Sequence, residues 1–278
     1  MCKILGVSKS GYYRWLSRQS TPLTEKEQKD LTLSKKIFQV FVENFGTYGS
    51  PRIYEELKDA GYSISQKKIA NMMREMNLRA TIPKVYQTST KSSNESDYPN
   101  VVNRNFNVTS INSVWVSDIT YIRTVEGWLY LATIMDLCSR KIVGWAMADH
   151  MKESLVVEAL NNALVSRKPS KGWIHHSDQG SQYMSTTYIE LLKDNKAIIS
   201  TSRKGNPYDN ACIEAFHATI KKECIYRQKI ETIKEAKRIV EKYIINFYNA
   251  KRRHSTLNYL SPSEFERNLH QINKSKVS

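Results

Sequence analysis

Three carboxylates stand in settings that suit metal-dependent phosphate chemistry. The first, Asp118, lies in WVSDITYI, the second, Asp178, in IHHSDQGSQY, and the third, Glu214, in NPYDNACIEAFHATIKKE. Carboxylate oxygens are the ligands that Mg²⁺ prefers in proteins. Two such ions about 4 Å apart can stabilise both the attacking and the leaving oxygen of a phosphoryl displacement. The three acids therefore predict a two-metal site for phosphodiester chemistry, provided that the fold brings them together.

Each acid also has a structural interpretation. Asp118 lies inside a strand-like run, where an unpaired charge is costly unless it points to solvent or binds a cation. Asp178 precedes Gln179-Gly180 and could hold a turn through its side chain. Glu214 could be a partly exposed helix residue, as most glutamates are. Taken singly, each acid is more readily structural than catalytic, so the prediction depends on their joint setting.

The sequence does not indicate a zinc site. The adjacent residues His175 and His176 should face opposite sides of a strand and cannot easily bind one ion together. We expect one of them to hydrogen-bond a phosphate or position the attacking water. The four cysteines are scattered and predict reduced thiols without a metal role; they are Cys2, Cys138, Cys212 and Cys224.

Positive charge is concentrated at the two ends of the chain. The 278 residues carry a net charge of +15, of which +6 falls in residues 1–100, +1 in residues 101–200 and +8 in residues 201–278. Basic arms around a nearly neutral centre are typical of proteins that bind a polyanion such as DNA. Excess lysine that only aids solubility is the alternative. No apolar run approaches the roughly 20 residues that cross a bilayer, and the first residues lack the pattern of a secretory signal. We therefore expect a cytoplasmic protein.

The first 80 residues predict a helical DNA-binding region. Apolar residues recur at helical spacing in three stretches between residues 31 and 80, and Ser50 should cap the second of these helices, with Pro51 following it. The last two helices have the size of a helix-turn-helix, and a small bundle with a solvated lysine face is the alternative. The last of the three helices, which is the second helix of this helix-turn-helix, would present four residues to DNA: Gln66, Lys67, Lys68 and Asn71. Residues 81–112, rich in Ser, Thr and Asn, predict a linker or extended arm.

Residues 113–230 predict an α/β core. Three strand-like runs are separated by hairpin-length breaks at Glu126-Gly127 and Ser139-Arg140. A helix, a strand, a helix and a fifth strand follow, which predicts a mixed five-stranded sheet with helices on both faces. Asp136 and Asp149 read as structural acids at element ends. Residues 231–278 predict a long periodic helix over residues 231–249, a basic turn and a short final helix.

The helix that carries Glu214 can be predicted in more detail. Asn206 should cap it, followed by Pro207 in the first turn and Asp209 at the positively charged end of the helix dipole. One stripe should pack on the sheet, namely Ile213, Phe216, Ile220 and Cys224. The neighbouring stripe consists of Asn210, Glu214, His217 and Lys221. Lys221 therefore lies two turns beyond Glu214 on the same side.

Together these motifs resemble a known family. WVSDITYI, DLCSRKIVGWAM, HHSDQGSQY, SRKGNPYDNACIEAFHATIKKE and YNAKRRHSTLNYLSPSEFE look like the integrase-type transposases of bacterial insertion sequences. The resemblance is to the second-reading-frame product of the IS-three family, over about residues 30–270. It implies a ribonuclease-H-like catalytic domain whose acidic triad is Asp118, Asp178 and Glu214, binding two Mg²⁺ ions, with Mn²⁺ as a substitute. It further implies a helix-turn-helix-like segment at residues 45–80 and a contact of Lys221 with the end of the mobile element.

The resemblance implies cleavage at the ends of an insertion sequence and transfer of the freed 3′-hydroxyl to another DNA. The partners would be double-stranded DNA with terminal repeats, target DNA, further copies of the chain in a synaptic complex, and the upstream-frame product, because no leucine zipper is visible here. The predicted contacts to backbone phosphates are Lys221, Arg203, Lys204, Lys251, Arg252, Arg253 and His254, and Lys67 and Lys68 are predicted to contact DNA from the helix-turn-helix. The predicted aromatic contacts to frayed bases are Trp115, Tyr183 and Tyr208.

Two other functions fit part of this pattern. A DNA-binding regulator with an inactive integrase-like core would share the basic arms and the N-terminal helices. A covalent recombinase would instead use Tyr259, close to the basic run, as its nucleophile. The three carboxylates favour the metal-dependent enzyme over both.

Overall fold

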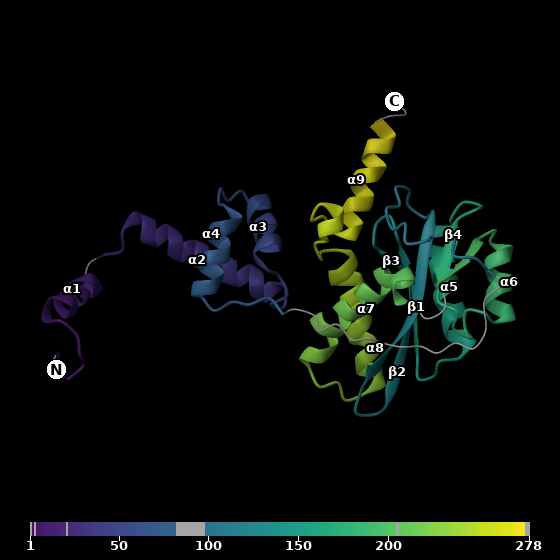
Figure 1. The fold of residues 1–278 in the computed structure, drawn as a ribbon, viewed down its shortest axis with the longest axis horizontal. Helices are drawn as coiled ribbons and strands as arrows, with labels where there is room; N and C mark the ends of the chain where they lie inside the picture. The colour runs from purple at the N-terminus through teal and green to yellow at the C-terminus, as the bar shows by residue number, and fades with distance from the viewer. Residues whose placement is uncertain (1, 3, 21, 82–97, 204–205, 276–278) are drawn as a thin grey trace. The chain divides into compact units, whose positions relative to one another are not determined.

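The chain forms two compact units, residues 1–81 and residues 82–278. The computed structural model describes residues 2, 4–20, 22–81, 98–203 and 206–275 (Figure 1). Lys204 and residues 82–97 of the predicted linker lie outside the described residues. In the part that the structure describes, we find no helix that is both long and apolar enough to cross a membrane.

The first unit is helical, as predicted. Its helices are α1 (Lys9–Ser20), α2 (Glu25–Glu43), α3 (Ser50–Asp59) and α4 (Gln66–Glu75). Thr24 caps α2 in a capping box with Glu27. Helices α2, α3 and α4 pack against one another, and their apolar stripes bury Ile37, Ile53 and Ile69 completely. This packing of one apolar face from each helix stabilises helices that would be marginal in isolation.

The predicted cap of α3 is off by one residue. Gly49, with an extended backbone, occupies the N-cap position, and Ser50 is the first helical residue. The cap of α4 agrees with the sequence, since the side chain of Ser65 accepts a hydrogen bond from the backbone N–H of Lys68.

The second unit is built on a mixed five-stranded sheet, which confirms the predicted fold class. The strands are β1 (Val114–Arg123), β2 (Trp128–Asp136), β3 (Ile142–Ala148), β4 (Ile174–Ser177) and β5 (Ile198–Thr201). Their order in the sheet is β3-β2-β1-β4-β5. The pairs β1–β2 and β2–β3 are antiparallel, whereas the pairs β1–β4 and β4–β5 are parallel. The central strand β1 therefore joins the hairpin half of the sheet to its crossover half.

Helices cover both faces of this sheet (Figure 1). Helices α5 (Glu153–Arg167) and α6 (Thr186–Asp194) lie on one face, and α7 (Ala211–Glu223) and α8 (Ile233–Lys242) lie on the other. Gly144 lets α5 approach β3 closely, because a Cβ there would lie 2.5 Å from the carbonyl oxygen of Ala159. The short 3-10 segment η1 (Pro207–Asn210) precedes α7. Asn206 caps η1, not α7 as predicted, through a hydrogen bond from the N–H of Tyr208.

Residues 98–102 pack against the edge strand β5. The hydroxyl of Thr201 donates to the carbonyl of Tyr98 at 2.6 Å, and the hydroxyl of Ser200 accepts from the N–H of Val101 at 2.9 Å. Val102 is buried. This end of the predicted arm thus belongs to the second unit and contacts the outermost strand of the sheet.

The C-terminal region departs from a single regular helix. Helix α8 ends at Lys242 and continues as the π-helical segment η3 (Tyr243–Asn249). The side chain of Asn249 accepts a hydrogen bond from the N–H of Ile142 at 3.0 Å and donates one to its carbonyl at 2.9 Å. The amide of Asn249 thereby satisfies both backbone groups of Ile142 at the start of the edge strand β3.

Helix α9 (Pro262–Ser275) is anchored by a buried acid. Glu266 accepts hydrogen bonds from the hydroxyl of Ser139 at 2.8 Å and the ammonium group of Lys141 at 2.9 Å, and it pairs with the guanidinium of Arg167. Close by, the carboxylate of Asp136 accepts backbone N–H bonds at the end of β2. Asp136 is therefore a structural acid, as its place in the sequence predicts.

Candidate active site

Asp118 lies at the centre of the sheet, in the middle of β1. It pairs across the antiparallel ladder with Thr133 of β2. His217 of α7 connects the two side chains, because its Nδ1 lies 3.2 Å from Asp118 Oδ2 and its Nε2 lies 2.7 Å from the hydroxyl of Thr133. The side chain of Asp118 remains 21% exposed. The fold therefore holds this carboxylate in place while leaving part of it open to solvent.

Asp178 is brought to the same level of the sheet by the parallel pairing of β1 with β4. Val116 pairs with His176, so residues 118 and 178 each lie two positions beyond a matched pair. The Oδ1 atom of Asp178 accepts a hydrogen bond from the N–H of Gly180 at 2.9 Å. Burial, followed by the charge of Asp118, raises the pKa of Asp178 to about 6. The predicted turn is present, and the carboxylate that makes it also faces a second acid.

Glu214 completes the group from the first turn of α7. Burial raises the pKa of Glu214 to about 7, with further contributions from the charges of Asp118 and Asp178. Asn210, just before α7, donates a hydrogen bond to the carbonyl of Ser117 at 3.0 Å and so ties the helix to β1. The structure therefore brings the three acids of the sequence into one electrostatically coupled group.

The chemistry of this group fits a divalent cation. The charge of Asp118 raises the pKa of Asp178, and the charges of Asp118 and Asp178 raise the pKa of Glu214, so the charged forms repel and a bound cation would reverse that effect. Five buried polar atoms that lie close to these acids in sequence have no hydrogen-bond partner among the described residues: Trp115 Nε1, His175 Nδ1, Gln179 Oε1, Tyr183 Oη and Asn210 Oδ1. In the described part of the chain, no three His, Cys, Asp or Glu side chains already stand close enough to hold an ion.

Lys221 lies beside the acids, as the helical spacing predicts. Its ammonium nitrogen is 4.5 Å from the centre of the Tyr121 ring. Burial lowers the pKa of Lys221, and the charge of Asp118 acts in the opposite direction. A half-buried cation next to an acidic group suits a phosphate that is held against the acids.

The prediction that His175 or His176 contacts a phosphate or the attacking water is wrong. Both are completely buried. His175 Nε2 lies 2.9 Å from the hydroxyl of Tyr188, and His176 Nδ1 lies 2.8 Å from the hydroxyl of Ser200. Burial lowers the pKa of His175 to about 3 and that of His176 to about 4, so both rings are neutral at pH 7. Neither histidine can reach a phosphate or an attacking water, because the strand that carries them runs through the core.

Two of the three aromatic residues predicted to contact bases are also buried. Trp115 has no exposed surface and Tyr183 is 2% exposed. The prediction that they stack on DNA is wrong, since both belong to the core on the α5 and α6 side of the sheet. Tyr208 is 69% exposed, with the guanidinium of Arg104 5.6 Å from its ring centre, so its contact with bases stays a prediction.

The prediction that Arg252 contacts a backbone phosphate is also wrong. Its guanidinium forms two hydrogen bonds of 2.8 Å to the carboxylate of Glu223, and both side chains are less than a tenth exposed. The hydroxyl of Tyr243 donates to the same carboxylate at 2.7 Å. Arg252 therefore joins the end of α7 to the turn after η3 and is not available to a phosphate. Its neighbour Lys251 is exposed.

The other predicted cations lie on surfaces of the two units. Arg253 donates to the carbonyl of Tyr259 at 3.1 Å, and the N–H of Tyr259 donates to the carbonyl of His254. Arg203 is half exposed and pairs with Asp209, which sequence spacing had placed beside the helix dipole. In the first unit, Lys67 is exposed and Lys68 is paired with Asp30 at 2.5 Å. Their contacts with DNA stay predictions.

Sequence reasoning missed the role of His217. It was placed on the stripe that carries Glu214, but no function was assigned to it. The signal was present in its spacing, since His217 follows Glu214 by three residues and must therefore point in a similar direction. Its contacts with Asp118 and Thr133 depend on the pairing of β1 with β2, which the helix alone could not reveal.

Known protein families match both units. Residues 27–86 match an HTH-like domain, and residues 109–207 and 195–262 match integrase core domains. The chain is 42% identical over 247 residues to the transposase for insertion sequence element IS904 of Lactococcus lactis, covering 88% of this chain and 97% of the relative. It is 37% identical over 267 residues to the transposase InsF for insertion sequence IS3A of Escherichia coli, covering 96% and 92% of the two chains.

The chain belongs to the IS3 family of insertion-sequence transposases. A third relative, a 31 kDa protein of insertion element IS600 from Shigella sonnei, is 38% identical over 273 residues and covers 98% of this transposase and 99% of its own length. The family and the role in DNA transposition predicted from the motifs are thereby confirmed. DNA is the partner of the transposase, and its HTH-like segment includes α2 as well as the two helices predicted for it.

Proposed function

We propose that the transposase is a DDE-type polynucleotidyl transferase that cuts the ends of its insertion sequence and joins the freed 3′-hydroxyl to another DNA strand. Asp118, Asp178 and Glu214 are the proposed catalytic acids and metal ligands. The observation that carries the proposal is their electrostatic coupling, in which the charges of Asp118 and Asp178 raise the pKa of Glu214 beyond the effect of burial.

The three acids would hold two Mg²⁺ ions, with Mn²⁺ as the substitute, and their side chains must draw closer together to do so. When bound, the ions would supply Lewis-acid stabilisation of both the attacking and the leaving oxygen. The acids come from a strand, the end of a second strand and a helix, so the packing of α7 on the sheet determines their distances. His217 orients Asp118, and Asn210 fixes the start of α7.

The reaction consists of two displacements at phosphorus. In the first, water attacks the scissile phosphate, a new P–O bond forms, and the bond to the 3′-oxygen breaks. In the second, that 3′-hydroxyl attacks a phosphate of another strand and displaces its 3′-oxygen. Lys221 would hold a non-bridging phosphate oxygen beside the acids in both steps, because it is the half-buried cation next to Asp118.

The remaining partners follow from the family and the charge distribution. The proposed substrates are the terminal repeats of the element and a target duplex, held by several copies of the chain in a synaptic complex, with the upstream-frame product as a further partner. The exposed face of α4 would read DNA through Gln66, Lys67 and Asn71. Lys251 and Arg203 would contact backbone phosphates.

Removal of the metal is expected to separate binding from chemistry. With EDTA in place of Mg²⁺, cleavage of oligonucleotides that carry the element's own ends should stop, whereas binding to the same oligonucleotides should persist. Gel analysis of the cleaved strand and fluorescence anisotropy measure the two properties on one preparation. Binding without any cleavage, with Mg²⁺ and with the upstream-frame product added, would favour the regulator over the enzyme. A protein–DNA adduct would favour the covalent recombinase.

Loss of Lys221 is expected to weaken DNA binding. Lys221→Ala should lower the affinity for the element's ends by about tenfold and reduce the slope of log affinity against log salt by about one, as expected for a single phosphate contact. Lys193→Ala is the matched control, because it removes an exposed lysine from α6 on the opposite face of the sheet. Equal losses in both variants would show that Lys221 contributes only to net charge.

A further inference from the structure

Two exposed aromatic rings lie side by side on the β1–β2 hairpin. The rings of Tyr121 and Trp128 meet edge to face, with centroids 5.3 Å apart and planes at 84°. Tyr121 is 50% exposed and Trp128 is 42% exposed. We call this pair the aromatic ridge. Large aromatic side chains that are half open to solvent, on strands whose other residues are largely buried, are typical of a binding surface.

A basic side chain lies over each ring of the aromatic ridge. The ammonium nitrogen of Lys221 lies 4.5 Å from the centre of the Tyr121 ring, and the guanidinium of Arg123 lies 5.4 Å from the centre of the Trp128 ring. These cation–π contacts hold both the rings and the charges in defined positions. Aromatic faces and fixed positive charges in one row complement a chain of bases and phosphates.

The hairpin that supports the aromatic ridge is held rigidly. Across its turn, the hydroxyl of Thr124 donates to the carbonyl of Gly127 at 2.8 Å. The segment before α8 then pairs with the turn, because the N–H groups of Val125 and Glu126 donate to the carbonyls of Ile230 and Glu231 at 3.0 Å each. A surface that is already ordered loses little conformational entropy when it binds a ligand.

The aromatic ridge begins at the proposed active site. Lys221 feels the charge of Asp118 and contacts Tyr121. Tyr121 and Arg123 follow Asp118 by three and five residues along β1, which is roughly 10–17 Å at the rise of a strand. About three to five stacked nucleotides span that distance at roughly 3.4 Å each. Because these odd spacings turn Tyr121 and Arg123 to the other face of β1 from Asp118, a DNA strand would reach the rings by passing around the edge of β1 beyond Val116, the last residue paired with β4, where Lys221 meets Tyr121.

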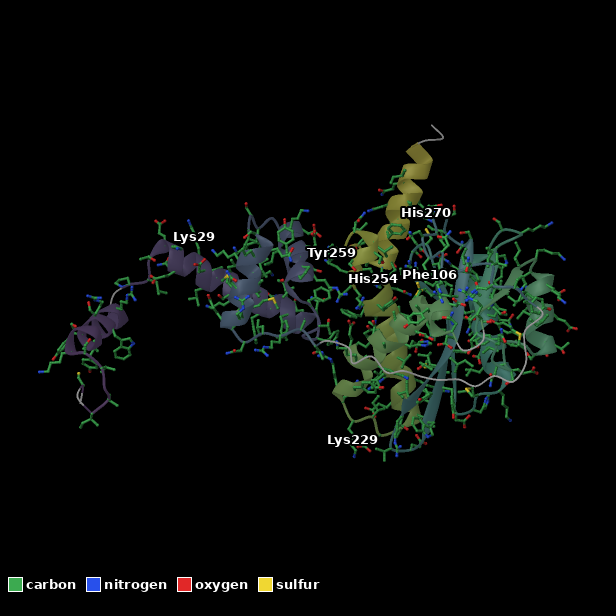
Figure 2. All side chains as sticks on the ribbon, in the orientation of Figure 1. Lys29, Phe106, Lys229, His254, Tyr259 and His270 are labelled. Carbon is green, nitrogen blue, oxygen red and sulfur yellow. The ribbon has the colours of Figure 1, made fainter. Side chains whose placement is uncertain are left out.

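A shallow hollow continues this path beyond Arg123. It has a volume of about 470 Å³ and is lined by Arg123, Thr124, Val125, Ile225, Tyr226, Gln228, Lys229 and Ile230. Ile225 and Ile230 are buried, whereas Tyr226 is 66% exposed. Lys229, labelled in Figure 2, pairs with Glu231 at the exposed rim, where such an ion pair is weak. The row of rings and cations thus extends past the hairpin turn.

We propose that the aromatic ridge is a base-stacking platform for single-stranded DNA, on which the unpaired strand next to the scissile phosphate is held. The inference rests on the proposed function, because that function places DNA at Asp118. Single-stranded DNA is favoured over a duplex since only unpaired bases leave their faces free to stack on protein rings. A surface that binds another protein is expected to hold fewer cations than this ridge does, because charged residues are depleted at the cores of protein interfaces.

The test compares two DNA probes on the full chain in EDTA, so that no cleavage occurs. One probe is a blunt duplex, and the other is the same duplex with a short thymine tail that contains 2-aminopurine. We expect Tyr121→Ala and Trp128→Ala each to weaken binding of the tailed probe by about fivefold to a hundredfold, the range for loss of one stacked base. The blunt probe should bind almost as before, and the 2-aminopurine signal of stacking should fall.

Matched variants separate stacking from a structural role. Tyr121→Phe and Trp128→Phe keep an aromatic face and should keep the tail preference, whereas Tyr121→Leu and Trp128→Leu keep apolar bulk and should lose it. Val165→Ala, at an exposed apolar residue of α5 outside this surface, should have no effect. Equal losses on both probes, or leucine variants that bind the tail like the native chain, would overturn the platform. Native cleavage with Mg²⁺ but no tail preference would reject only this inference, and a tail preference without cleavage would reject only the proposed function.

Discussion

Replacing Asp118 or Asp178 by asparagine is expected to lower the rate of cleavage at the element's ends by about a thousandfold or more. Metal ions contribute several kcal/mol of transition-state stabilisation, and each 1.36 kcal/mol is about a factor of ten in rate. Asparagine keeps the size of the side chain and removes the charge that would hold the ions. Glu214→Gln should behave in the same way. Single-turnover cleavage of end oligonucleotides in Mg²⁺ measures the effect.

Asp178→Asn distinguishes catalysis from structure most sharply. The amide oxygen of asparagine can still accept the hydrogen bond from the N–H of Gly180 that Asp178 accepts at 2.9 Å, so the turn should survive. The charge of Asp118 raises the pKa of Asp178, and the charge of Asp178 raises the pKa of Glu214, so removing the charge of Asp178 should leave the melting temperature equal or higher. Asp149→Asn, at an exposed acid outside the site, is the control. Native cleavage rates in the Asp118 and Asp178 variants would contradict the proposed mechanism.

Replacing Arg252 by methionine is expected to lower the free energy of unfolding by about 3–5 kcal/mol, because the carboxylate of Glu223 would remain buried without its partner. The two side chains are 8% and 6% exposed and are joined by two hydrogen bonds of 2.8 Å. Denaturation in urea measures the loss. Changing both partners, Arg252→Met with Glu223→Leu, should restore much of the stability, since an apolar pair of similar volume replaces a costly buried ion pair.

Lys251→Met provides the matched control for Arg252. It removes an exposed cation one residue earlier and should leave the free energy of unfolding within about 0.5 kcal/mol of native. Lys251→Met should weaken DNA binding, whereas Arg252→Met should not do so beyond its effect on folding. If Arg252→Met instead reduced DNA affinity at native stability, the guanidinium would be a phosphate contact and not a structural one.

The elements of the catalytic unit could be predicted because their signals are local. Alternating β-branched and aromatic residues mark β1, β2 and β3, and the breaks at residues 126–127 and 139–140 fall between the observed strands. Helix α7 buries the apolar stripe of Ile213, Phe216 and Ile220 that its period predicts. Details at element ends were less predictable, as the cap of α3 and the π-helical segment after α8 show. The π-helical segment ends at Asn249, whose side chain accepts a hydrogen bond from the N–H of Ile142 in the distant strand β3.

The fate of single polar and aromatic side chains was not predictable from their types. Arg252 and Lys251 are neighbours in one basic run, yet only Arg252 meets a buried carboxylate. Trp115 and Tyr121 lie on the same strand, yet one is fully buried and the other is half exposed. Because the sheet is covered by helices over its centre and left open at the hairpin, exposure depends on how far along β1 a residue lies.

The sequence by itself determined the family and the fold class and predicted the three acids, because these depend on residue types at fixed spacings within short segments. Only the tertiary structure decided which side chains surround those acids. The parallel pairing of β4 with β1 and the packing of α7 across the sheet bring His217 and Lys221 to Asp118, bury His175 and His176, and leave Tyr121 and Trp128 exposed. Contacts between segments far apart in the chain depend on register and packing, which no local pattern of residues records.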